Sequence, residues 1–221
     1  MKKILALLFI VTSFNLFAQE QLTKEIKDLI PTGHEVLDIA SGDLNSDGRK
    51  DYVLLLRSSD HNKVPKVNNQ EKIHLTRRGL LVILSNKNKH EIVVQNLDCF
   101  SSENVEGGLY YTPELFINIK RGNLYINFAH GKNGSWKYTF RSHGRDFALI
   151  GFDQIYPSEY KSDYVLFDEK SINYLTHKQL VRKVVNVSKS GNEIFKEIWN
   201  IIPKQDSKFL SAIKNFDDIE M

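Results

Sequence analysis

The sequence predicts a mainly β protein of the β-rich α+β class, built from antiparallel meander sheets with a short N-terminal helix. Three observations lead to this prediction. Apolar and polar residues alternate with a period of two through much of residues 115–152, short glycine-containing turns interrupt the alternation, and further apolar runs of strand length occur on both sides. With 221 residues, the chain is long enough to bury one sizeable core.

The first 18 residues have the layout of a secretory signal peptide. Lys2 and Lys3 form a positive start, residues 4–11 are an uninterrupted apolar run, and Ala18 offers a small residue for cleavage. The apolar run is shorter than the roughly 20 residues needed to span a membrane. We therefore expect an exported protein, periplasmic or extracellular, in which residues 19–221 form a single β-rich domain that is monomeric and has no membrane span.

Charge and cysteine content exclude several classes of protein. Removal of Lys2 and Lys3 takes the formal charge from +3 to +1, so no global field attracts nucleic acid or an anionic membrane. Cys99 is the only cysteine, and an intramolecular disulfide is therefore impossible. Because Cys99 lies beside Leu97 and Phe100, we interpret it as a small core residue, with a catalytic thiol as the alternative.

The N-terminal half is expected to begin with a short amphipathic helix in residues 19–30, which Pro31 ends and which would cover one end of a sheet. Apolar patterns then predict strands at residues 35–40, 52–56, 79–84 and 91–97. The second of these is a continuous apolar run, as expected for a strand that is buried on both faces. Residues 58–78 are the longest polar stretch and are rich in basic side chains, which indicates a solvated insertion or an anion-binding loop.

The clearest pattern in the chain predicts a four-stranded antiparallel meander in residues 115–152. Its alternating aromatic residues indicate the buried face of a sheet, with a ligand platform as the alternative. Further strands are expected at residues 164–167, 172–175, 179–187 and 194–202, of which the last two form a hairpin. The sequence also allows a short C-terminal helix, capped by Asp206 or Ser207, that would turn its apolar residues inward, namely Phe209, Leu210, Ile213 and Phe216.

One acidic loop, DLNSDGRKD in residues 43–51, carries a specific chemical signature. Calcium takes six to eight oxygen ligands, and a tight loop can supply them from alternate positions. Gly48, at the sixth position, permits the sharp turn that such a loop needs. The sequence therefore predicts a structural Ca²⁺ site formed by the side chains of Asp43, Asn45, Asp47 and Asp51 and the backbone carbonyl of Arg49. The alternative is an acidic turn held by side-chain to backbone hydrogen bonds without a metal.

The loop differs from an EF-hand, because Leu54 stands where the bidentate glutamate belongs and strands flank the loop in place of helices. It resembles instead the calcium loops of FG-GAP and VCBS repeats, as in the integrin α-subunit propeller. The resemblance covers residues 39–56, and it implies that the loop joins two strands and that its last aspartate leads into an apolar strand. A propeller needs several repeats and this chain has one, so we expect a single repeat-like hairpin and not a full propeller.

Three functions are compatible with these features. The first is a non-catalytic binding module, stabilised by calcium, with a protein or glycan partner. The second is a hydrolase of envelope or extracellular glycans that uses the acidic residues Asp38, Asp43, Asp47 and Asp51. The third is an envelope inhibitor or immunity-type protein that acts through residues 58–78. We favour the first and assign no catalytic residues, because the sequence contains no nucleophile elbow or zinc-protease motif and its seven histidines are scattered.

Overall fold

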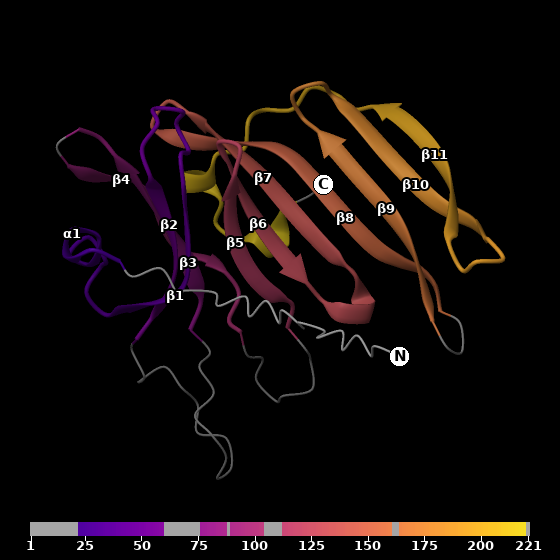
Figure 1. Cartoon of the computed structure of the whole chain (residues 1–221), viewed down its shortest axis with the longest axis horizontal. Helices are drawn as coiled ribbons and strands as arrows, with labels where there is room; N and C mark the ends of the chain where they lie inside the picture. Colours follow the sequence, from indigo (N-terminus) through magenta and orange to yellow (C-terminus); the bar gives the residue numbers. More distant parts are fainter. Residues whose placement is uncertain (1–21, 60–75, 88, 104–111, 161–163, 220–221) are drawn as a thin grey trace, which may run out of the picture.

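In the computed structural model, two antiparallel sheets pack against each other (Figure 1). The structure describes residues 22–59, 76–87, 89–103, 112–160 and 164–219. The expected signal peptide and residues 60–75 of the basic stretch lie outside the described residues. The described part is mainly β with very little helix and contains no propeller, as the sequence predicts.

The smaller sheet has four strands in the order β1-β2-β3-β4, and each strand pairs with its neighbour in sequence. These strands are β1 (His34–Gly42), β2 (Asp51–Ser58), β3 (Arg78–Ser85) and β4 (His90–Phe100). They coincide with the four strands expected in the N-terminal half. The central strands β2 and β3 are nearly continuous runs of buried apolar residues, so both faces of this sheet must be covered.

The larger sheet is a meander of seven strands in the order β11-β10-β9-β8-β7-β6-β5. Its strands are β5 (Glu114–Lys120), β6 (Asn123–Ala129), β7 (Ser135–His143), β8 (Asp146–Tyr160), β9 (Val165–Asn173), β10 (Lys178–Val187) and β11 (Glu193–Ile201). The predicted four-stranded meander and the predicted C-terminal hairpin are both present.

The expectation of two separate short strands at residues 164–167 and 172–175 is wrong, because β9 runs unbroken from Val165 to Asn173. The middle of β9 consists of polar residues, Asp168 to Ser171, and the strand continues through them. Cross-strand partners satisfy these polar side chains within the sheet. Asp168 accepts the Val184 amide at 2.9 Å, Glu169 pairs with Arg182 at 2.6 Å, and Ser171 donates to Asp153 at 2.6 Å.

The main core lies between the two sheets. Val53, Leu55, Leu80 and Val82 of the smaller sheet face Leu124, Ile126, Tyr138 and Phe140 of the larger one, and all eight are buried. The alternating aromatic residues Phe128, Tyr138 and Phe140 therefore form the buried face of the meander, which was the favoured interpretation. Cys99 belongs to the same core, and burial raises the pKa of its thiol to about 12, which leaves it protonated at neutral pH.

A short helix, α1 (Lys24–Lys27), covers the second face of the smaller sheet. Thr23 caps it by accepting a hydrogen bond from the Ile26 amide at 3.4 Å. Leu22 and Ile26 pack with Leu54, Leu56, Leu81 and Ile83, which form a second apolar cluster. The helix is shorter than expected, and it packs on a face of the sheet, where the sequence analysis expected it to cover one end. In the described part of the chain, no helix is long and apolar enough to cross a membrane.

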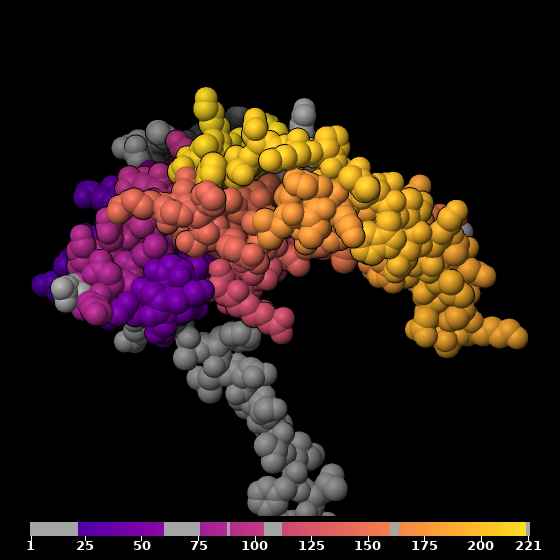
Figure 2. Space-filling view, turned by 90° about the horizontal axis from the view of Figure 1, so that it is seen from above, coloured from indigo at the N-terminus to yellow at the C-terminus, as the bar shows by residue number. Residues whose placement is uncertain are grey.

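The C-terminal segment, residues 202–219, crosses the convex side of the molecule and closes the core (Figure 2). It forms no α-helix, so the expected C-terminal helix is wrong. Two 3-10 turns, Leu210–Ala212 and Phe216–Asp218, take its place. The side chain of Asn96 on β4 donates hydrogen bonds to the carbonyls of Leu210 and Ile213 at 2.8 and 2.7 Å, and these contacts replace the bonds within a helix. The inward placement of Leu210, Ile213 and Phe216 was nevertheless predicted correctly.

We expect Phe216→Ala to lower the free energy of unfolding by about 3–5 kcal/mol, because it leaves a cavity in the main core. Phe216 is 2% exposed, and its ring stacks on Phe100 with the centroids 4.6 Å apart. Urea unfolding followed by circular dichroism measures the change. The same substitution at the exposed Phe116 is the matched control and should cost much less. Equal losses for the two variants would contradict the assignment of the C-terminal segment to the core.

Candidate metal-binding loop

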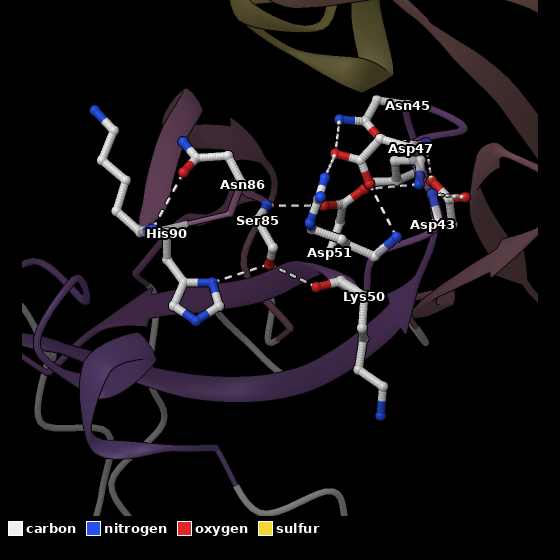
Figure 3. A network of polar contacts seen from close by, with 12 residues as sticks. Asp43, Asn45, Asp47, Lys50, Asp51, Ser85, Asn86 and His90 are labelled. Atoms are coloured by element: carbon white, nitrogen blue, oxygen red, sulfur yellow. Dashed lines mark hydrogen bonds and ion pairs between the residues drawn. The ribbon is translucent and has the colours of Figure 1, made fainter.

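The acidic loop connects β1 to β2, and side-chain to backbone hydrogen bonds fold it into a tight turn (Figure 3). The two carboxylate oxygens of Asp43 accept hydrogen bonds from the amides of Asp47 and Gly48, at 3.1 and 2.9 Å. Asn45 accepts from the Asp47 amide at 3.1 Å. Gly48 has a φ of +79°, a left-handed conformation that a residue with a side chain adopts at a cost.

The Asp47 carboxylate interacts with Arg49, the residue that follows Gly48. Its carboxylate accepts a hydrogen bond from the Arg49 amide at 2.9 Å and forms an ion pair with the Arg49 guanidinium at 3.1 Å. Desolvation acts to raise the pKa of Asp47, but the bonds from Arg49 and Asn45 outweigh it and lower that pKa below its ordinary value. Asp47 is therefore ionised at neutral pH and already has a cationic partner.

Asp51 differs from the other acidic residues because it is fully buried. One carboxylate oxygen accepts the Leu44 amide at 2.8 Å, and the other accepts the Ser85 amide at 2.9 Å. Asp51 thus fastens the start of the loop to the end of β3. Burial raises the pKa of Asp51, and the nearby charges of Asp47 and Asp43 raise it further, although the two amide hydrogen bonds lower it.

The loop also contacts the larger sheet. A Cβ atom added to Gly42 would lie 2.7 Å from the Ile119 side chain on β5. The turn between β5 and β6 comes close as well, since a Cβ added to Gly122 would lie 3.8 Å from the Asp43 carbonyl oxygen. The loop therefore sits where the two sheets meet. Asp38, four residues before Gly42 on β1, accepts the Ile117 amide at 3.1 Å and joins β1 to β5.

The donors in the loop are oxygen atoms of the kind that calcium prefers. Each oxygen of Asp43 and Asp51 accepts one hydrogen bond from a backbone amide, which leaves it a lone pair for a cation. The arrangement is not a ready metal cage. Within the described ranges, no three His, Cys, Asp or Glu side chains form a group that could hold a metal ion. Asp51 faces backbone amides, and Asp47 would have to exchange the Arg49 guanidinium for the metal.

The network continues beyond Asp51 through three residues that the sequence analysis did not single out, Ser85, His90 and Glu25, of which Figure 3 labels the first two. The Ser85 hydroxyl donates to the Lys50 carbonyl at 2.6 Å and lies 2.9 Å from Nδ1 of His90. Nε2 of His90 lies 3.4 Å from the carboxylate of Glu25 on α1. No motif signals this group, because sheet pairing brings together residues that lie far apart in the sequence.

This serine, histidine and glutamate lie in a line, but they are not placed for nucleophilic catalysis. Ser85 is only 5% exposed, and its proton is directed at a backbone carbonyl and not at the histidine. A serine nucleophile needs an accessible oxygen whose proton passes to the base. The group therefore joins β3, β4 and α1, and we assign it a structural role.

The comparisons with known proteins give no identity for this chain: no protein-family model, no curated protein and no solved structure matches it. The similarity to FG-GAP and VCBS loops therefore remains a local resemblance, carried by the nine residues of the loop and the two strands that flank it.

We expect Asp51→Asn to lower the free energy of unfolding by about 1–3 kcal/mol, because the new amide nitrogen faces a buried N–H donor in place of an acceptor. Asp43→Asn is the matched control, since Asp43 also accepts two amides but at an exposed site. Chemical unfolding in a chelating buffer at neutral pH measures both. A loss at Asp43 as large as that at Asp51 would contradict the anchoring role.

The raised pKa of Asp51 predicts a specific pH dependence of stability. Between 3.8, the ordinary value, and the higher value in the folded state, the folded protein holds a proton that the unfolded chain has released. The stability that Asp51 contributes is therefore greatest at low pH and declines as the pH rises through this window. We expect the free energy of unfolding of the wild type, minus that of Asp51→Asn, to fall as the pH rises when both are measured in chelator. A constant difference would sink the prediction.

Proposed function

We propose that this protein is an exported, non-catalytic binding module whose acidic loop binds calcium and stabilises the fold. The observation that supports the proposal most strongly is the placement of three carboxylates, those of Asp43, Asp47 and Asp51, within one turn. Burial is the main cause of the raised pKa of Asp51, and the charges of Asp47 and Asp43 raise it further, so the turn contains an electrostatic repulsion that a divalent cation would relieve.

The position of the loop favours a structural role for the metal. The Asp51 carboxylate of the loop accepts the Ser85 amide of the smaller sheet. The loop backbone lies against the β5–β6 turn of the larger sheet. A cation bound to the folded loop and not to the unfolded chain would therefore stabilise the junction of the two sheets. A site of about 10 μM affinity in about 1 mM calcium would add roughly 2.7 kcal/mol to the free energy of unfolding.

The other functions have weaker support. For the hydrolase, the acidic residues form hydrogen bonds to backbone amides, and the Ser85 hydroxyl is buried and donates to a carbonyl. Acid–base catalysis needs a titratable group that can reach a substrate. The inhibitor or immunity-type function depended on residues 58–78, most of which lie outside the described residues.

A melting experiment tests the calcium proposal. In calcium, we expect the wild-type Tm to exceed its value in EGTA by about 5–10 °C. Asp43→Asn and Asp47→Asn should each reduce this difference, and Asp98→Asn, which alters an exposed carboxylate on β4, should not. Arg49→Ala keeps the backbone carbonyl but removes the cation that competes for Asp47, so it should bind calcium more tightly by calorimetry. A wild-type Tm that is the same in calcium and EGTA would refute the proposal.

A further inference from the structure

The face of the larger sheet that points away from the core carries a continuous row of side chains across all seven strands. Successive register partners define it. The row begins at Phe116 on β5, passes through Asn127, Lys137, Asp153 and Ser171 on β6–β9, and ends at Leu180 and Trp199 on β10 and β11. Register partners in an antiparallel sheet lie on the same face, so these side chains form one line.

This face contains a hollow of about 530 Å³, lined by six residues of the row and by a parallel row that includes Ile155, Glu169 and Arg182. The molecule is arched, and the end formed by β9–β11 curves downward in Figure 2. A sheet that is bent in this way has one concave face. The volume is within the range of small-molecule sites. A hollow built on paired strands is also rigid, which lowers the entropic cost of binding.

Apolar side chains stand exposed along the hollow. Phe116 is 45% exposed and Ile155 is 44% exposed, and Trp199, at the far end of the row, is 62% exposed. The two ends of the row are thus aromatic. With strands about 4.8 Å apart, a row of seven strands extends roughly 29 Å along the sheet, which suits an extended ligand better than a compact one.

Four of the five charged residues that line the hollow neutralise one another in two pairs, and the ammonium group of the fifth, Lys170, lies over the Phe152 ring, 5.9 Å from its centroid. Lys137 pairs with Asp153 at 3.2 Å, and Asp153 also accepts the Ser171 hydroxyl at 2.6 Å. Arg182 pairs with Glu169 at 2.6 Å and lies over the Phe195 ring, 4.2 Å from its centroid. A charged ligand would have to break these pairs to gain a partner. A purely apolar ligand would strip water from them without replacing its hydrogen bonds, which is costly.

A neutral ligand rich in hydroxyl groups avoids both costs. Its hydroxyls can donate to the carboxylates and accept from the cations while the pairs stay intact. The apolar faces of its rings can stack on aromatic side chains. We infer that this hollow is a binding site for a neutral oligosaccharide, lying across the strands between Phe116 and Trp199. The inference deepens the proposed function, since it rests on the protein being a binding module, but it does not depend on calcium.

The experiment titrates the full-length mature protein with neutral hexasaccharides of glucose in α and β linkage, mannose, xylose and N-acetylglucosamine, and with the acidic hexagalacturonate. Calorimetry gives the affinity. Intrinsic fluorescence gives a second readout, because the exposed Trp199 lies at the end of the row, whereas the other tryptophan, Trp136, stacks on Phe128 on the core face. We expect binding of at least one neutral hexasaccharide and none of the acidic one.

Substitutions test the location. Phe116→Ala and Trp199→Ala each remove an exposed ring and should weaken binding about 3–10-fold. Tyr164→Ala, which removes an exposed ring outside the hollow, should leave it unchanged. The double variant Lys137→Gln with Asp153→Asn removes both charges of one pair but keeps polar groups there. It should weaken binding of the neutral ligand about 3–10-fold, because hydrogen bonds to charged groups are stronger than those to neutral groups.

The inference fails if no neutral hexasaccharide binds the folded protein, if hexagalacturonate binds better than the neutral ligands, or if Phe116→Ala and Trp199→Ala both bind as the wild type does. Titrations in calcium and in EGTA separate this result from the calcium proposal. A calcium-dependent Tm without saccharide binding overturns only the inference. Saccharide binding with a Tm that ignores calcium overturns only the metal site.

Discussion

The four-stranded sheet is apolar on both faces, and this constraint accounts for most of the architecture. Leu54 and Leu56 point to one side of β2 while Val53 and Leu55 point to the other, and all four are buried. An apolar face left in water would forfeit roughly 25 cal/mol for each Å² that could be buried. The larger sheet and the C-terminal segment therefore cover one face, and the N-terminal helix covers the other.

Asp51 joins this packed sheet to the acidic loop. Its carboxylate lies at the start of β2, where it satisfies the buried amides of Leu44 and Ser85. This interaction holds the start of the loop against the end of β3, so its outer carboxylates stay at the junction of the two sheets. Burial raises the pKa of Asp51 and the charges of Asp47 and Asp43 raise it further, and this repulsion between carboxylates supports the proposal of a cation there.

The larger sheet has two faces with different roles. Toward the core it presents Phe128, Tyr138 and Phe140, which supply most of the aromatic packing. On the other face it presents paired charges with exposed rings at both ends of the row. Alternation along each strand makes this division possible, because neighbouring residues point to opposite faces. One sheet can therefore stabilise the fold and offer a rigid surface for a ligand.

The sequence by itself determined the fold class, nearly every strand, and the residues of the acidic turn, because period-two alternation and the Asp43–Asp51 spacing are local signals. Only the tertiary structure decided that Asp51 faces the amides of Leu44 and Ser85, that β9 continues through polar residues, and that the C-terminal segment packs as two 3-10 turns. It also decided which side chains share the cross-strand row. These outcomes depend on pairing and burial between segments distant in the chain, which override local propensity.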